Sequence, residues 1–225
     1  MKKGIIFDLD GTLLNSLVDI ADAVNFVLKK NQFPIHEFEA YKKFIGNGIE
    51  VLSRKALPQN ISDIEFSNYF YEIKESYQLR QNTRTLPYKG ILELLEELNR
   101  IGIKIAILSN KPHEFVEPTV KMYFPNIKFE ILLGSRLDVP RKPNPEAVFE
   151  ILRILGLERK DCFFVGDTAT DINTGNNSGL DTIGVLWGFR GVEELKSEGA
   201  TYIVDSPDEI LSLIIKNKAI KKINS

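Results

Sequence analysis

The sequence predicts an α/β fold: a doubly wound, Rossmann-like parallel sheet with an all-helical segment inserted after the first strand. From Pro87 onward, apolar runs of strand length alternate with amphipathic stretches of helical spacing, which is the pattern of βαβ units. One further apolar run, Ile5–Phe7, stands near the start of the chain, as expected for a strand buried on both faces. The sequence between these two regions carries only helical patterns.

That intervening segment predicts a helical cap with four helices. The first follows Ser16-x-x-Asp19, a variant of the capping box, and the fourth begins near Ser62. The second spans about His36 to Phe44, and the third passes through Val51 and Leu57. The predicted parts are a core of residues 1–14 and 83–225, a cap of residues 15–82, and two hinge crossings near Asn15 and Asn82.

The core elements are predicted from the same two periodicities. The expected strands are Gly4–Phe7, Lys104–Ser109, Phe129–Leu133, Cys162–Val165, Thr182–Leu186 and Tyr202–Val204. The expected helices are 91–98, 115–123, 145–155 and one through 210–215. Gly102 and Gly156 stand where helices end, as C-cap glycines do. The basic end, Lys216–Lys222, is expected to be a solvated tail.

Two carboxylates follow the first strand. Asp8 and Asp10 alternate, so they project to one side while the chain is extended, and Gly11 then permits a turn. A calcium loop would need glycine at its sixth position and glutamate at its twelfth, where this chain has Leu13 and Asp19. Acids at the carboxyl end of a buried strand lie where open α/β sheets bind ligands.

Three other core segments carry polar residues at similar places. Ser109 and Asn110 end the next strand, although they could instead cap the following helix. Lys142 lies between prolines in a segment that could also be an ordinary surface loop. Asp167 follows the apolar run of another strand directly, and Asp171 comes four residues later.

This order of Asp-x-Asp, Ser, Lys, and Gly-Asp with a further Asp resembles the four motifs of the haloacid dehalogenase superfamily, most of whose members are phosphatases. Two C-terminal segments, Trp187–Arg190 and Ala200–Pro207, resemble the phosphoglycolate phosphatase branch. Gly46-Asn47-Gly48 in the cap also resembles that branch, although a plain inter-helix turn would explain it equally well.

The resemblance implies a role for each matching residue. Asp8 is the implied nucleophile that forms an aspartyl-phosphate, and Asp10 is the implied general acid and base. The implied Mg²⁺ ligands are the side chains of Asp8 and Asp167 and the backbone carbonyl of Asp10, with Asp171 supporting them. The implied substrate-binding residues are Thr12, Ser109, Asn110, Lys142, Gly46, Asn47 and Gly48, and Lys142 is also an implied catalytic residue beside Asp8 and Asp10. A cation is required because a carboxylate and a phosphate about 4 Å apart repel by roughly 4 kcal/mol per charge pair at a dielectric constant near 20.

Composition and residue counts argue against several other classes of protein. The charge balance, Lys+Arg 29 against Asp+Glu 31, gives no electrostatic footprint for nucleic acid or an anionic membrane. The single Cys162 lacks the arginine of a cysteine phosphatase six residues later, and two isolated histidines are too few for a histidine-rich metal site. No signal peptide or membrane span is expected, so a soluble cytoplasmic protein, monomeric or homodimeric, is predicted.

The expected function is Mg²⁺-dependent hydrolysis of a small phosphate monoester, with 2-phosphoglycolate as the best candidate. A sugar-phosphate mutase, pyrophosphatase or nucleotidase of the same superfamily is the alternative. A regulatory or scaffold protein without activity is a third reading, which the intact acidic and lysine motifs disfavour.

Overall fold

The computed structural model describes residues 2–216, and its centre is one parallel sheet. The strand order is β5–β4–β1–β6–β7–β8, and all five neighbouring pairs are parallel. The bounds are β1 Gly4–Phe7, β4 Lys104–Pro112, β5 Ile131–Ser135, β6 Cys162–Gly166, β7 Asp181–Val185 and β8 Tyr202–Val204. The chain builds the sheet outward from β1, first to one side and then to the other. The predicted doubly wound fold is confirmed.

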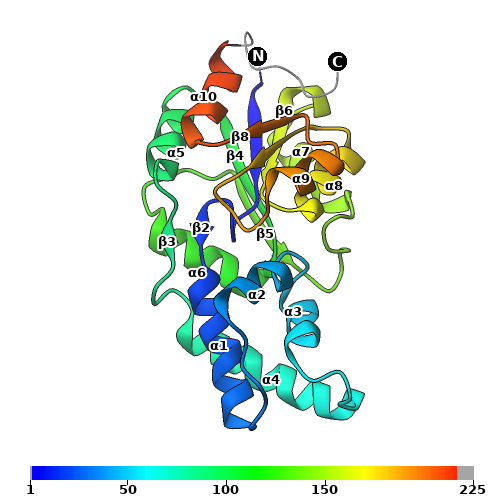
Figure 1. The fold of residues 1–225 in the computed structure, drawn as a ribbon. Helices are drawn as coiled ribbons and strands as arrows, with labels where there is room; N and C mark the ends of the chain where they lie inside the picture. Colours follow the sequence, from blue (N-terminus) through cyan, green and yellow to red (C-terminus); the bar gives the residue numbers. More distant parts are fainter. Residues whose placement is uncertain (1, 217–225) are drawn as a thin grey trace.

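Helices cover both faces of this sheet (Figure 1). Successive side chains of β1 point to opposite faces of the sheet, so the strand contributes to two apolar clusters. Ile5 and Phe7 belong to one cluster, and Ile6 belongs to the other. The first cluster includes α5 (Ile91–Arg100), α6 (His113–Tyr123) and α10 (Pro207–Lys216). The second includes α7 (Glu146–Leu155), while α8 (Ala169–Ser178) packs on β6 and β7, and α9 (Val192–Ser197) packs on α8.

The inserted segment forms four helices at the end of the molecule opposite α10 (Figure 1). These are α1 Leu17–Lys30, α2 Phe38–Phe44, α3 Ile49–Ala56 and α4 Asp63–Arg80. They share an apolar cluster that includes Val24, Tyr41 and Ile73. Phe115 and Phe189, from the core, also belong to this cluster, so the cap is packed against the core.

The two crossings between cap and core are paired with each other. Residues Leu14–Asn15 (β2) and Leu86–Pro87 (β3) form a short antiparallel ladder that the sequence did not reveal. The predicted capping box at Ser16 is wrong, because the Ser16 side chain makes no cap hydrogen bond. The Asp19 carboxylate instead accepts hydrogen bonds from the backbone N–H groups of residues 83–85 and from the Thr85 hydroxyl. It thereby ties α1 to the second crossing.

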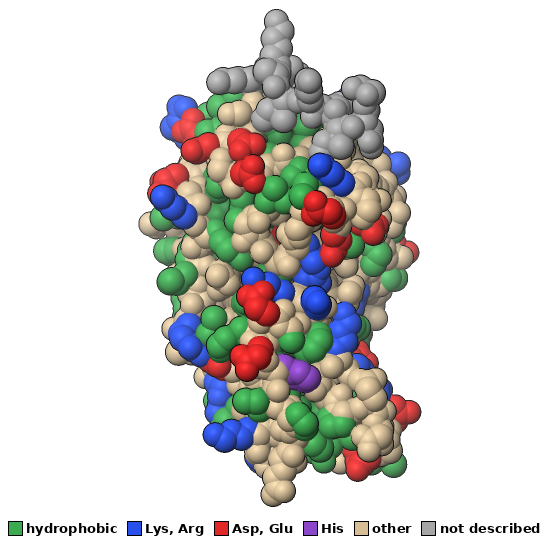
Figure 2. Space-filling model, in the orientation of Figure 1, with side chains coloured by type: hydrophobic (Ala, Val, Ile, Leu, Met, Phe, Trp, Pro, Cys, Tyr) green, Lys and Arg blue, Asp and Glu red, His purple; other side chains and the backbone are tan. Residues whose placement is uncertain are grey.

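Other boundaries shift slightly. β4 continues three residues beyond the predicted end at Ser109, and β5 begins two residues later than predicted. No helix among the described residues 2–216 is both long and apolar enough to span a membrane. Charged side chains of both signs are interspersed over the face of the molecule that Figure 2 shows.

Candidate active site

Three buried carboxylates meet at the carboxyl end of the central strands. Asp8 directly follows β1 and Asp167 directly follows β6, and the register pairs Phe7 with Val165, so the two strands end side by side. Asp171 lies in the first turn of α8. Carboxylate oxygens of Asp8, Asp167 and Asp171 lie within 4.8 Å of one another.

Two of these carboxylates are fixed by hydrogen bonds from the protein. Asp167 accepts one from the Thr12 hydroxyl (3.2 Å) and one from the backbone N–H of Phe189 (2.8 Å). Asp171 accepts two from Thr168, the N-cap residue of α8. A Cβ atom at Gly188 would lie 2.3 Å from the Asp167 Cβ, so only glycine permits this close approach.

Lys142 joins the nucleophile candidate to the acidic cluster. Its Nζ donates to Asp8 Oδ1 and to Asp171 Oδ1, both at 2.7 Å. Burial disfavours the ammonium, but Asp171 and Asp8 outweigh that effect and raise the pKa of Lys142. Asn110 fixes the lysine backbone, since its Oδ1 accepts from Lys142 N and its Nδ2 donates to the carbonyls of Lys142 and Gly46.

The local charge balance favours a cation. Burial raises the pKa of Asp8 to about 7, with Lys142 opposing the shift and Asp171 adding to it. Burial, followed by Asp171 and Asp8, also raises the pKa of Asp167. The oxygens of the three acids converge, and Lys142 forms ion pairs with two of them, Asp8 and Asp171. An all-oxygen donor set of this kind fits a hard divalent cation.

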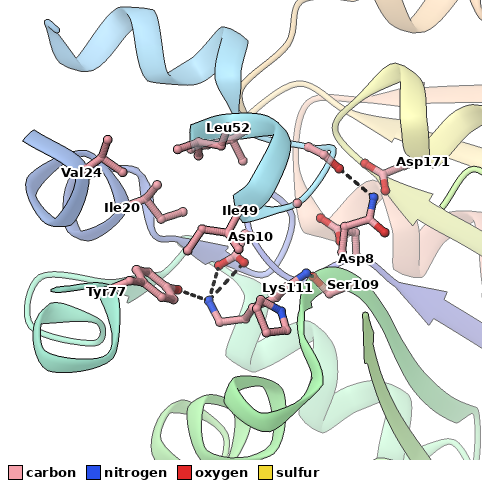
Figure 3. Close-up of a pocket in the computed structure, with 15 residues that line it drawn as sticks. Asp8, Asp10, Ile20, Val24, Ile49, Leu52, Tyr77, Ser109, Lys111 and Asp171 are labelled. Carbon is pink, nitrogen blue, oxygen red and sulfur yellow. Dashed lines mark hydrogen bonds and ion pairs between the residues drawn. The ribbon is translucent and has the colours of Figure 1, made fainter. Parts of the chain in front are cut away.

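Asp10 is held by a lysine that the sequence motifs did not predict. Lys111, near the end of β4, places its Nζ 3.3 and 3.2 Å from the two Asp10 carboxylate oxygens and also donates to the hydroxyl of Tyr77 on α4 (Figure 3). Ser109 and Lys111 are two residues apart in an extended strand, so they share one side. The alternate spacing of Ser109 and Lys111 is the feature of the sequence that could have predicted Lys111 at the site.

A partly open cavity lies between these residues and the cap. Its core side includes Asp8, Asp10, Ser109, Asn110, Lys111 and Asp171. Its cap side is mainly apolar and consists of Ile20, Val24, Ile45, Gly46, Gly48, Ile49, Leu52 and Tyr77 (Figure 3). About 60 Å³ of it is open to the centre of a water-sized sphere.

The predicted substrate-binding residues occupy different places around this cavity. Ser109, Asn110, Gly46 and Gly48 line it. Thr12 is buried behind it against Asp167. The Asn47 side chain is directed to the core, where its Oδ1 accepts a hydrogen bond of 2.9 Å from the Thr170 hydroxyl.

Residues 5–185 match the model of the haloacid dehalogenase-like hydrolases. The chain belongs to this family. Its resemblance to the superfamily, predicted from four short motifs, is therefore confirmed over most of the sequence.

Several proteins similar to this chain are named phosphoglycolate phosphatases. The phosphoglycolate phosphatase of Pseudomonas savastanoi pv. phaseolicola is 29% identical over 209 residues, covering 91% of this chain and 77% of the relative. That of Psychrobacter arcticus is 29% identical over 227 residues, covering 96% of each chain. A crystal structure from Lactobacillus delbrueckii subsp. bulgaricus, provisionally assigned the same name, has a TM-score of 0.90 and 32% identity, covering 96% of this chain and all of the other.

Proposed function

We propose that this haloacid dehalogenase-like hydrolase is a Mg²⁺-dependent phosphatase that converts 2-phosphoglycolate to glycolate and phosphate through an aspartyl-phosphate on Asp8. The observation that carries the proposal is the position of Asp8: it is bonded to Lys142, adjoins two further acids and lines a small cavity between core and cap. The family and the names of its relatives support the phosphatase class.

The reaction divides into two displacements. A carboxylate oxygen of Asp8 attacks phosphorus, the bond from phosphorus to the leaving oxygen breaks, and Asp10 gives that oxygen its proton. In the second step a water molecule attacks the same phosphorus, Asp10 takes up a proton from it, and the bond to Asp8 breaks. Ser109, which lines the cavity, and Lys142, which bonds to Asp8, would bind the phosphoryl oxygens, where negative charge is concentrated.

The metal would be held by the side chains of Asp8 and Asp167 and by the backbone carbonyl of Asp10, with Asp171 supporting the cluster. Bound there, Mg²⁺ would offset the charge of the carboxylates and of the phosphate dianion. The ammonium of Lys142 bridges the carboxylates of Asp8 and Asp171 and compensates part of their negative charge. Thr12 and the Phe189 N–H fix the orientation of Asp167.

The cavity favours a small leaving group. The open space of about 60 Å³ leaves little room for a sugar or nucleoside beside the phosphoryl group while the cap, residues 15–82, lies in this position. Its apolar cap side offers few partners for sugar hydroxyls. Gly46 and Gly48 line the cap side of the cavity with backbone and no side chain, so the carboxylate of 2-phosphoglycolate could approach this loop closely.

A panel of phosphate esters tests this proposal. Phosphate release is measured with 2-phosphoglycolate, glucose 1-phosphate, a nucleoside monophosphate and pyrophosphate, each with Mg²⁺ and with EDTA. We expect the highest kcat/KM for 2-phosphoglycolate. A higher kcat/KM for the sugar phosphate or the nucleotide would show that 2-phosphoglycolate is not the preferred substrate. If no ester releases phosphate, the result would instead support a regulatory or scaffold protein without activity.

A further inference from the structure

Lys111 is a buried cation whose position depends on two different parts of the molecule. It lies at the end of β4 in the core, with 7% of its surface exposed. Its ammonium contacts both carboxylate oxygens of Asp10 and the hydroxyl of Tyr77, which belongs to the cap helix α4. Burial opposes the charge of Lys111, and Asp10 and Tyr77 offset that cost, so its pKa is raised.

Tyr77 is itself fixed from both sides. Its ring meets that of Phe115, at the start of the core helix α6, edge to face at a centroid distance of 5.7 Å. Its side chain is buried and lines the cavity. Lysine can only donate, so the Tyr77 oxygen must accept, and this acceptor reaches Lys111 only while α4 lies over the core.

Asp10 has few other restraints. Among the described residues, Lys111 is the only side chain that bonds to its carboxylate. If Tyr77 moves away with the cap, the ammonium loses one of its two buried partners and its fixed position. The Asp10 side chain then loses the group that orients it.

We propose that Lys111 and Tyr77 are positioning residues that hold Asp10 in place for proton transfer when the cap is packed on the core. The proposal rests on the function given above, in which Asp10 serves both displacements. It adds that cap packing and the orientation of the acid–base residue are linked through one hydrogen-bonded chain.

The second displacement provides the clearest test, because the leaving group has already departed and substrate contacts can no longer matter. Rapid mixing with p-nitrophenyl phosphate separates the two steps. Nitrophenolate release reports attack by Asp8, which needs little acid because this leaving group is stable as an anion. Steady-state turnover reports breakdown of the phosphoenzyme, which needs Asp10 as base.

The variants are Tyr77→Phe and Lys111→Met, with Asp10→Asn as the positive reference. Tyr41→Phe is the matched control, since it also removes a buried cap hydroxyl, which donates to Asn25 far from Asp10. We expect steady-state turnover of both test variants to fall about 10- to 100-fold, the loss typical of one hydrogen bond to a charged group, while the first burst stays fast. Tyr41→Phe should keep the wild-type ratio of the two rates.

The Asp10→Asn reference should show a fast nitrophenolate burst followed by slow steady-state turnover. If it does, the proposal is overturned when Tyr77→Phe slows the burst and the steady-state turnover equally, or slows neither. If Asp10→Asn shows neither a burst nor a phosphoenzyme, the proposed function itself fails. Tyr77→Phe preserves the ring packing and the buried charge pair, so it decides the question even if Lys111→Met does not fold.

Discussion

Replacing Lys142 with Met should destabilise the metal-free protein, and more strongly at high pH. The Lys142 side chain is 2% exposed and its Nζ lies 2.7 Å from both Asp8 Oδ1 and Asp171 Oδ1. Removing one partner of a buried ion pair costs about 3–5 kcal/mol of unfolding free energy. The carboxylates left behind, within 4.8 Å of each other, repel by roughly 3–4 kcal/mol at a dielectric constant near 20 if both stay ionised.

The pH dependence follows from the pKa of Asp8, which is about 7 in the folded protein against 3.8 for an unperturbed aspartate. Between these values the folded state binds a proton that the unfolded state does not, so stability falls as pH rises through that window. Loss of Lys142 raises the pKa of Asp8 further. The deficit of the variant should therefore be larger near pH 8 than near pH 6, where a proton on Asp8 relieves the repulsion, by up to about 1.4 kcal/mol per pH unit.

Urea unfolding in EDTA at the two pH values measures this difference. Lys74→Met is the matched control, because Lys74 is a partly exposed lysine 3.9 Å from Glu114 and pairs near the surface contribute about 1 kcal/mol or less. An equal deficit at both pH values would refute the coupling of Asp8 ionisation to Lys142. A deficit no larger than that of Lys74→Met would refute the buried ion pair altogether.

Three further predictions concern the metal, the cap contact and the hinge. EDTA should abolish phosphate release and Mg²⁺ restore it, whereas Ca²⁺ should inhibit, since its larger coordination shell can bind Asp8 bidentately and occupy the attacking oxygen; full activity in EDTA would contradict this. Asn47→Ala and Thr170→Val each remove the same neutral hydrogen bond between cap and core, so each should lower kcat/KM about 2- to 10-fold to a similar extent on 2-phosphoglycolate and on an aryl phosphate. A much larger loss on 2-phosphoglycolate in Asn47→Ala alone would instead indicate a substrate contact. Asp19→Asn should lower the free energy of unfolding by about 2–3 kcal/mol, because a carboxylate that accepts hydrogen bonds from four donors becomes an amide with one oxygen; an unchanged urea midpoint would show that this contact is dispensable.

The parts of the site that the sequence predicts are those defined by local pattern. Asp8 and Asp167 each follow an uninterrupted apolar run, and parallel strands bring such ends to one edge of the sheet. The strand order then places both acids together without any knowledge of side-chain contacts. The same local patterns predict the helical segment between residues 15 and 82.

The parts that the sequence does not predict depend on packing between distant segments. Lys111 and Tyr77 are 34 residues apart and meet only because α4 lies over the end of β4. Asp19 fits a capping motif by spacing, but three free N–H groups at the second crossing are better partners for its carboxylate. Asn47 lies in a loop that resembles a substrate-binding segment, yet its side chain bonds to Thr170 of α8.

The central claim is that Asp8 becomes phosphorylated during turnover. The direct measurement is mass spectrometry of peptides from protein quenched in acid during turnover with 2-phosphoglycolate and Mg²⁺, for the wild type, Asp10→Asn and the isosteric Asp8→Asn. We expect one phosphoryl group on Asp8 in the wild type, and neither phosphorylation nor turnover in Asp8→Asn. Asp10→Asn, quenched during turnover of p-nitrophenyl phosphate, whose leaving group needs little acid, should hold more of the phosphorylated form than the wild type does with the same substrate. Turnover that persists in pure Asp8→Asn protein would contradict the mechanism.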